Sequence, residues 1–245
     1  MRYVLGGGAG ILRSCPKFRS FNNIAHRFRY VGDNLYAYRK GWLGLFANFS
    51  KMYANYYRHA GLPTMIVPWG TSRLWHENLE LNRDIDVLWM GKRRTKRRSL
   101  LLEKIHDELG ARGLTMYLAD GVEKPFIFGE ARTELLNRAK ITLNLRWHRH
   151  DNVFSSRFHI AAGNKSLVVS EPFQPHYHAY QKGIHFVDAP LEELVNSIVH
   201  YISHPEERNR IVENAYQLVT TQLTLQNSVA SIMKAAEEQW ISQRG

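Results

Sequence analysis

A run of cations in the middle of the chain offers the first chemistry. Six of the eight residues Gly91-Lys92-Arg93-Arg94-Thr95-Lys96-Arg97-Arg98 are Lys or Arg. They lie between an apolar run expected to form a buried strand, Asp86–Met90, and an expected helix over 99–112. A helix N-terminus attracts anions, and guanidinium groups grip phosphates bidentately. This placement favours a diphosphate site over a solvated charge run of the nucleic-acid-binding kind. It does not say which cations touch the ligand.

A second polar loop, Arg146–Asn152, follows an expected strand over 141–145. The next helix would open at Ser155 or Ser156, because serine is a preferred N-cap residue. Arg157 and His159 would then lie in the first helical turn and face the same crevice as the basic loop. Together these residues predict a polar wall on the other side of a shared ligand site.

Three histidines in this region, His148, His150 and His159, are of a type that binds metals. No carboxylate joins them at ligand spacing on one regular element, as a metal site would require. We therefore expect no metal and no cofactor.

Glu171 directly follows an expected strand over 166–170. A carboxylate in that place could accept hydrogen bonds from ribose or sugar hydroxyls, or it could be an exposed loop acid; the sequence leaves both open. The next loop, with His176, Tyr177, His178 and Tyr180, could line a sugar pocket. The glycine cluster Gly6–Gly10 lacks the full spacing and ribose-binding acid of a dinucleotide turn.

The elements that must position these residues alternate between strand and helix after Leu62. Further strands are expected over 65–68, 114–118 and 185–187, and further helices over 131–139, 156–162, 192–203, 206–219 and 226–240. This alternation predicts an α/β fold with a mainly parallel sheet covered on both faces. In such sheets ligands bind at the carboxyl ends of strands, where the strand order reverses. Before Leu62, apolar spacings of three and four predict one helix over Tyr36–His59, ending near Gly61.

Charge is distributed unevenly along the chain. The net charge is +11, and residues 1–60 carry ten Lys or Arg against Asp33 alone. Such a segment can contact an anionic membrane surface or a partner subunit, or can simply be solvated. Nucleic acid ranks lowest as a partner, because no recognition motif accompanies the charge. No apolar run is long enough to span a membrane, no signal peptide is evident, and Cys15 is the only cysteine. These features predict a cytoplasmic protein, peripheral at most to the inner face of the membrane.

Four segments in the same order resemble one family, the glycosyltransferase group 1 domain of spore-maturation-type and related bacterial enzymes with the GT-B fold. They are Asp86–Gly91 with the basic loop, Phe128–Leu145 with its Gly-Glu and Ala-Lys-Ile-Thr-Leu-Asn motifs, Arg157–Gly163, and Tyr201–Arg208 with His-Pro-Glu-Glu-Arg. The four segments span residues 86–208.

The resemblance implies a Rossmann-like domain over residues 62–245 that binds a nucleoside diphosphate sugar without a metal. Residues 1–61 would be a truncated part of the acceptor-side domain, with helices over 206–240 packing back on it. The diphosphate would be bound by Gly91, Lys92, Arg93, Arg97 and Arg98. The nucleoside and sugar would be contacted by Phe128, Gly129, Arg146, His148, Ser155, Ser156, Arg157, His159 and Glu171.

The chain departs from the family at His159, where a glutamate is usual, and Glu171 could substitute for it. No catalytic residue is therefore assigned beyond these two candidates. The expected function is a hexosyltransferase-type glycosyltransferase whose acceptor is a glycan, a lipid-linked molecule or a protein. The first alternative is a non-catalytic nucleotide-binding fragment or subunit of such an enzyme, and the second is a nucleic-acid-binding protein.

Overall fold

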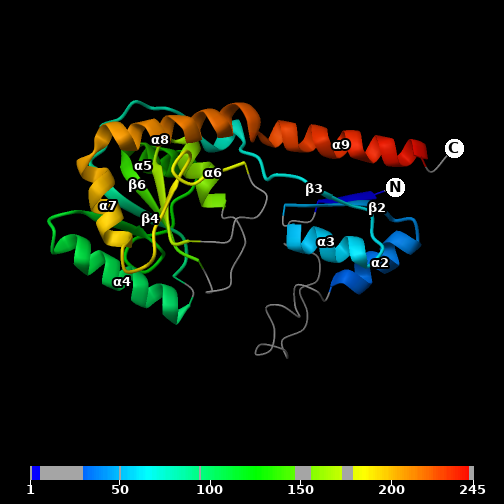
Figure 1. Ribbon diagram of the computed structural model, residues 1–245, viewed down its shortest axis with the longest axis horizontal. Helices are drawn as coiled ribbons and strands as arrows, with labels where there is room; N and C mark the ends of the chain where they lie inside the picture. The colour runs from blue at the N-terminus through cyan, green and yellow to red at the C-terminus, as the bar shows by residue number, and fades with distance from the viewer. Residues whose placement is uncertain are drawn as a thin grey trace. The chain divides into compact units, whose positions relative to one another are not determined.

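The computed structural model describes residues 2–5, 30–49, 51–93, 95–146, 156–172 and 179–242. The chain divides into two compact units (Figure 1). One comprises Met1–Pro68 with Asn227–Gly245, and the other comprises Trp69–Gln226. The second unit contains the predicted site loops that the structure describes.

The sheet of the Trp69–Gln226 unit has five parallel strands in the order β5-β4-β6-β7-β8. Their bounds are β4 Ile85–Met90, β5 Met116–Ala119, β6 Ala139–Asn144, β7 Leu167–Ser170 and β8 Val187–Asp188. The three central strands are buried along almost their whole length, as expected of strands covered on both faces. The prediction of an α/β fold with a parallel sheet is confirmed.

Helices pack on both faces of this sheet (Figure 1). On one face lie α4 (Lys96–Gly110) and α7 (Leu194–Ser203), whose buried side chains share a core with alternate strand residues. On the other lie α5 (Gly129–Arg138) and α6 (Ser156–Gly163). Helix α8 (Pro205–Gln217) contributes to both cores, and a π-helical turn, Leu218–Gln222, follows it. Each fully buried Leu or Ile in these cores contributes about 1.5–3 kcal/mol.

Helix α4 begins earlier than the sequence predicted. Thr95 caps it, because its side chain accepts a hydrogen bond from the backbone N–H of Arg98. Leu102, Ile105 and Leu109 form the buried stripe that holds the helix on the sheet. The last three cations of the basic run therefore belong to the first helical turn.

The strand order reverses beside β4. From β4 the chain crosses through α4 to β5 on one side, then returns through α5 to β6 on the other side. The carboxyl ends of β4 and β6 consequently diverge into loops that leave toward opposite faces. This is the position at which ligands bind in open α/β sheets.

The other unit contains a three-stranded parallel sheet in the order β1-β2-β3. Its elements are β1 Arg2–Leu5, α2 Tyr30–Arg39, β2 Leu43–Asn48, α3 Lys51–His59 and β3 Thr64–Ile66. The prediction of one helix over Tyr36–His59 is wrong. Gly41, with a φ of +70°, lies between α2 and β2. All of β2 is buried in the middle of the sheet.

Helix α9, Leu225–Ser242, closes the described chain. From Asn227 onward it belongs to the same compact unit as Met1–Pro68. Ser228 Oγ donates to the carbonyl of Pro68 at 2.7 Å, and Gln239 Nε2 donates to the carbonyl of Gly44 at 2.7 Å. Within the described residues, no helix is long and apolar enough to cross a membrane.

Candidate functional site

The loops after β4 and β6 meet at the strand-order reversal. Arg157, in the first turn of α6, donates from Nη2 to the carbonyl of Met90 at 2.8 Å and from Nη1 to Asn144 Oδ1 at 2.6 Å. Arg98, in the first turn of α4, donates from Nη2 to the carbonyl of Leu145 at 2.8 Å. The sequence predicted that these loops lie at one edge of the sheet, and the structure joins them there through hydrogen bonds from arginine side chains to backbone carbonyls.

One indole ring holds both guanidinium groups. Trp89 is fully buried in β4. The guanidinium carbons of Arg157 and Arg98 lie 4.4 Å and 5.3 Å from its ring centroid, within cation–π range. Burial and the nearby charge of Arg98 lower the pKa of Arg157 to about 9. Because the two cations penalise each other's charge, a bound anion at this point would relieve the repulsion.

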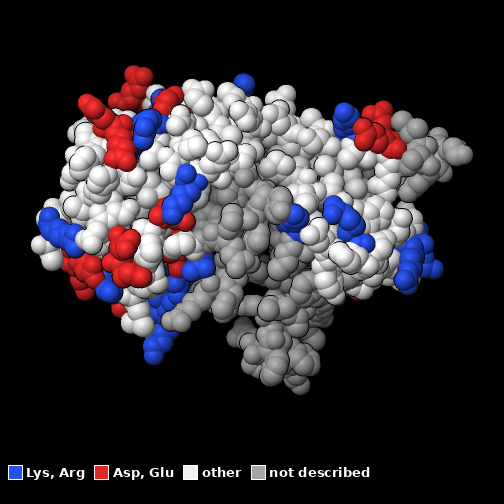
Figure 2. Space-filling view, in the orientation of Figure 1, with Lys and Arg blue, Asp and Glu red and all other residues white. Residues whose placement is uncertain are grey.

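Gly91 begins the loop that runs past these cations. Its φ is +118°, a conformation that residues with side chains rarely adopt, and a Cβ there would lie 3.1 Å from Arg157 Nη2. Its carbonyl accepts a 2.7 Å hydrogen bond from Trp89 Nε1. The glycine therefore lets the loop lie against the guanidinium pair. Figure 2 shows Lys and Arg side chains gathered at the lower end of α4, where this loop lies.

The other predicted diphosphate residues differ in what they contact. Arg98 Nη1 donates back to the carbonyl of Lys92 at 3.2 Å, which closes the loop onto the helix. The side chain of Lys92 is exposed, with Nζ 5.9 Å from the ring centroid of Phe126. Lys96 is also exposed. Arg94 lies outside the described residues.

Arg93 points toward the end of β5 and into a cluster of carboxylates. It donates from Nε to Asp120 at 2.5 Å and pairs with Glu103 at 3.2 Å and Glu123 at 3.1 Å. Burial raises the pKa of the Asp120 carboxyl, but the Arg93 hydrogen bond and two backbone N–H groups outweigh this and hold that pKa below its usual value. The charge of Arg93 is thus compensated within the chain, although its diphosphate contact stays a prediction.

Glu171 is completely buried, so the alternative of an exposed loop acid is wrong. It accepts from Arg97 Nη1 at 3.1 Å and from Arg97 Nη2 at 2.5 Å. It also accepts from the backbone N–H of Arg146, whose Nε lies 3.3 Å from Oε2. Two of the predicted ligand-binding arginines therefore converge on this one carboxylate.

His159 is buried, and its Nδ1 lies 3.1 Å from the hydroxyl of Tyr180. Burial raises the pKa of Tyr180 well above its usual value. Tyr180 also packs edge-on against Phe158. The histidine at the family's glutamate position thus lies among aromatic groups. Ser156 is exposed at the start of α6, while Ser155, His148 and His150 lie outside the described residues.

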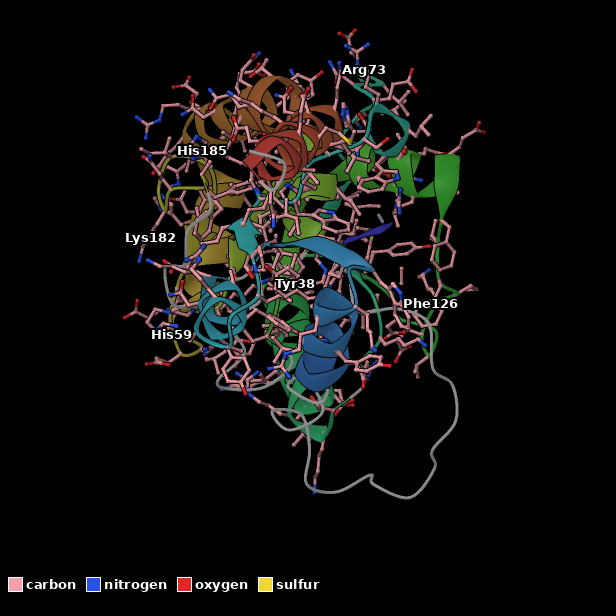
Figure 3. The ribbon with its side chains drawn as sticks, turned by 90° about the vertical axis from the view of Figure 1, so that its right-hand side faces the viewer. Tyr38, His59, Arg73, Phe126, Lys182 and His185 are labelled. Carbon is pink, nitrogen blue, oxygen red and sulfur yellow. The ribbon has the colours of Figure 1, made fainter. Side chains whose placement is uncertain are left out.

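Phe128 and Gly129, the predicted base contacts, lie at the start of α5. Phe128 is 73% exposed and serves as the N-cap residue, and Gly129 has a φ of +59°. The ring of Phe126, labelled in Figure 3, lies 6.5 Å from that of Phe128. Two apolar rings are therefore available at the edge of the site, as stacking on a base requires.

Sequence reasoning missed three residues of this site, namely Trp89, Asn144 and Asp120. The positions of Asn144 and Asp120 at strand ends could have indicated them. Trp89 could not be identified in this way, because a tryptophan within a buried strand is typical of a hydrophobic core. Among the described residues, no group of three or more His, Cys, Asp or Glu could hold a metal ion.

The five parallel strands, the helices on both faces and the reversal of strand order define a Rossmann-like class of domain. The model of a family described as glycosyl transferase-like matches residues 93–234. This is more than half of the chain, and the chain belongs to that family. The resemblance to group 1 glycosyltransferases is thereby confirmed. No curated protein sequence matches the chain.

Solved structures of GT-B glycosyltransferases share the fold. The pneumococcal O-GlcNAc transferase GtfA in complex with UDP and GlcNAc is 11% identical, with a TM-score of 0.59 over 84% of this chain and 47% of that one. Anabaena HepE in complex with UDP is 12% identical, with a TM-score of 0.58 over 84% and 66%. S. aureus TarM is 8% identical, with a TM-score of 0.64 over 89% and 48%. The chain covers about half to two thirds of the length of these structures.

Proposed function

We propose that this chain transfers a sugar from a nucleoside diphosphate sugar, with the donor diphosphate bound between the basic loop after Gly91 and the start of α6. The observation that carries the proposal is the pair of guanidinium groups, Arg98 and Arg157, that share the indole of Trp89. They lie at the ends of β4 and β6, beside the N-terminus of α4. Arg98, Arg157 and the N-terminus of α4 each attract an anion, and they meet at the same point.

The chemical role of the pair follows from how glycosyl transfer develops charge. As the bond between sugar and diphosphate breaks, negative charge grows on the leaving diphosphate. Cations and helix N–H groups that are already in place stabilise this charge without reorganising. Arg98 and Arg157 are held by carbonyl and amide oxygens of the strand ends, so their positions are set before the donor arrives. We propose that no metal is needed; transfer should then persist in a chelator.

The GtfA and HepE structures are complexes with UDP, which supports UDP as the first nucleotide to test. Calorimetric titration of the chain with UDP, GDP and dTDP tests the proposal. At least one should bind, and absence of binding for all three at about 1 mM, where even weak specific sites are occupied, would refute it. The phenyl rings of Phe126 and Phe128 are the proposed contacts of the base.

A second candidate function is supported by His159. The family's usual acid is absent there, and the imidazole faces the hydroxyl of Tyr180. A neutral imidazole can accept only one hydrogen bond, whereas a carboxylate accepts one from each of two hydroxyls. The chain could therefore bind a nucleotide without turnover, as a subunit of a larger transferase. Release of sugar from a donor by the purified chain would exclude this second function.

A further inference from the structure

Glu171 raises an electrostatic question within the proposed anion site. A completely buried carboxylate lies among the same loops as the guanidinium pair. Its negative charge repels phosphate, and burying it is costly unless cations and hydrogen bonds compensate. A site that only attracted a diphosphate would bind it more tightly without the Glu171 carboxylate. The hydrogen bonds of Glu171 indicate what it contributes instead.

Those bonds connect three segments that are distant in sequence. Both terminal nitrogens of Arg97, in the first turn of α4, contact the two oxygens of Glu171 after β7. Arg97 Nη1 also donates to the carbonyl of Arg146 at 3.1 Å. Arg146, after β6, donates its backbone N–H to Glu171, and its Nε lies 3.3 Å from Oε2, at ion-pair distance. The carboxylate thus holds the guanidinium group of Arg97 near the ends of β6 and β7, and the charged head of Arg146 lies beside it.

This cluster adjoins the guanidinium pair through consecutive residues. Arg98 is bonded to the carbonyl of Leu145, while its neighbour Arg97 is bonded to the carbonyl of Arg146. Long side chains lose about 1.5–2 kcal/mol of rotamer freedom on being ordered. If a buried carboxylate already orders these side chains, ligand binding does not carry that entropic cost.

We infer that Glu171 is a positioning residue that acts through Arg97 and Arg146, and that it does not bind the donor's ribose or sugar hydroxyls. The inference rests on the proposed diphosphate site. It predicts the direction in which anion affinity changes when Glu171 is removed. By charge alone, removing Glu171 should strengthen anion binding, because a repulsive charge is lost. If the carboxylate positions the arginines, removing it should weaken anion binding.

Inorganic pyrophosphate is the decisive probe, because it has phosphates but no ribose or sugar. Its affinity and that of UDP are measured by calorimetry for the unmodified chain, Glu171→Gln and Glu171→Asp. We expect Glu171→Gln to weaken both ligands about tenfold, the equivalent of one pKa unit of interaction. Glu171→Asp, which keeps the charge, should restore part of the affinity.

Asp86→Asn is the matched control. Asp86 is also buried and also pairs with a cation, Lys140, at 2.6 Å, but it lies near the start of β4, at the opposite edge of the sheet. The acid-to-amide change is the same, so a general effect of breaking a buried ion pair would appear here too. Both affinities should be unchanged in this variant.

Three outcomes would overturn the inference. Unchanged or tighter pyrophosphate binding by Glu171→Gln would show that charge or hydroxyl contact, not positioning, is its role. Equal weakening by Asp86→Asn would show a general structural effect. Binding of neither probe by the unmodified chain would remove the proposed function itself.

A double variant keeps the test valid if Glu171→Gln alone folds poorly. Arg97→Gln combined with Glu171→Gln removes both buried charges together. If Glu171 acts through Arg97, this double variant should bind pyrophosphate within about twofold of Arg97→Gln alone, because the two effects are not additive. A double variant that binds pyrophosphate about tenfold more weakly than Arg97→Gln alone would contradict the inference.

Discussion

The cations of the basic loop should separate into two functional kinds, and comparing Arg98 with Arg93 tests this. Arg98 stacks on Trp89 and is bonded to strand-end carbonyls, whereas Arg93 is bonded to three carboxylates. A charge-assisted hydrogen bond to a phosphate contributes about 1.5–3 kcal/mol. Arg98→Gln should therefore weaken UDP binding about 10- to 150-fold.

Arg93→Gln should act on stability instead. It leaves Asp120, whose side chain is 0% exposed, without its cation. Breaking a buried ion pair by removing one partner typically costs about 3–5 kcal/mol. We therefore expect a lower urea midpoint for Arg93→Gln. Although the sequence predicted that Arg93 contacts the diphosphate, three carboxylates already compensate its charge, so we expect UDP affinity within about twofold of the unmodified chain.

Two measurements on each variant decide the matter, namely calorimetric titration with UDP and urea unfolding followed by circular dichroism. The titrations are run without urea, in a buffer in which both variants show the native far-UV circular dichroism spectrum. If Arg93→Gln, while folded, lost as much affinity as Arg98→Gln, the distinction between the two arginines would be wrong. The diphosphate would then have to displace carboxylates from Arg93.

Three further outcomes are expected. The pKa of Asp120 is lowered in the folded state, so its stabilisation is present above the unfolded pKa of about 4 and is lost as the pH falls through the folded pKa. The difference in free energy of unfolding between the unmodified chain and Asp120→Asn, measured in urea, should therefore shrink from pH 7 to pH 3, and a constant difference would contradict this. Gly91→Ala puts a methyl 3.1 Å from Arg157 Nη2 at a φ of +118°, and should cost about 1–2 kcal/mol and weaken UDP binding; a variant with unchanged UDP affinity would argue against close packing. Gly70→Ala puts a methyl 2.2 Å from the backbone of Thr224, and should lower the free energy of unfolding by about 1–3 kcal/mol or more; full stability in thermal unfolding would show that this backbone can move.

Much of the Trp69–Gln226 unit is predictable because its signals are local. The apolar spacing of Leu102, Ile105 and Leu109 specifies the buried face of α4, and Thr95 specifies where it begins. Strand and helix alternate with little ambiguity, so the parallel sheet follows from general rules of chain connection. The one-helix prediction for Tyr36–His59 was wrong because a short buried strand between two helices preserves apolar spacings of three and four. Only the pairing of β2 with strands on both sides reveals its conformation.

The sequence alone predicts which loops share one edge of the sheet. Cations after one strand, a second arginine at the next helix start and an acid after a third strand must share an edge, because parallel strands end on the same side. It could not determine which cation faces a ligand. That depends on partners far along the chain, such as Glu171, which is 74 residues from Arg97, and Asp120, which is 27 residues from Arg93. These pairings cannot be predicted from neighbouring residues, because folding brings the charges together only once the sheet has formed.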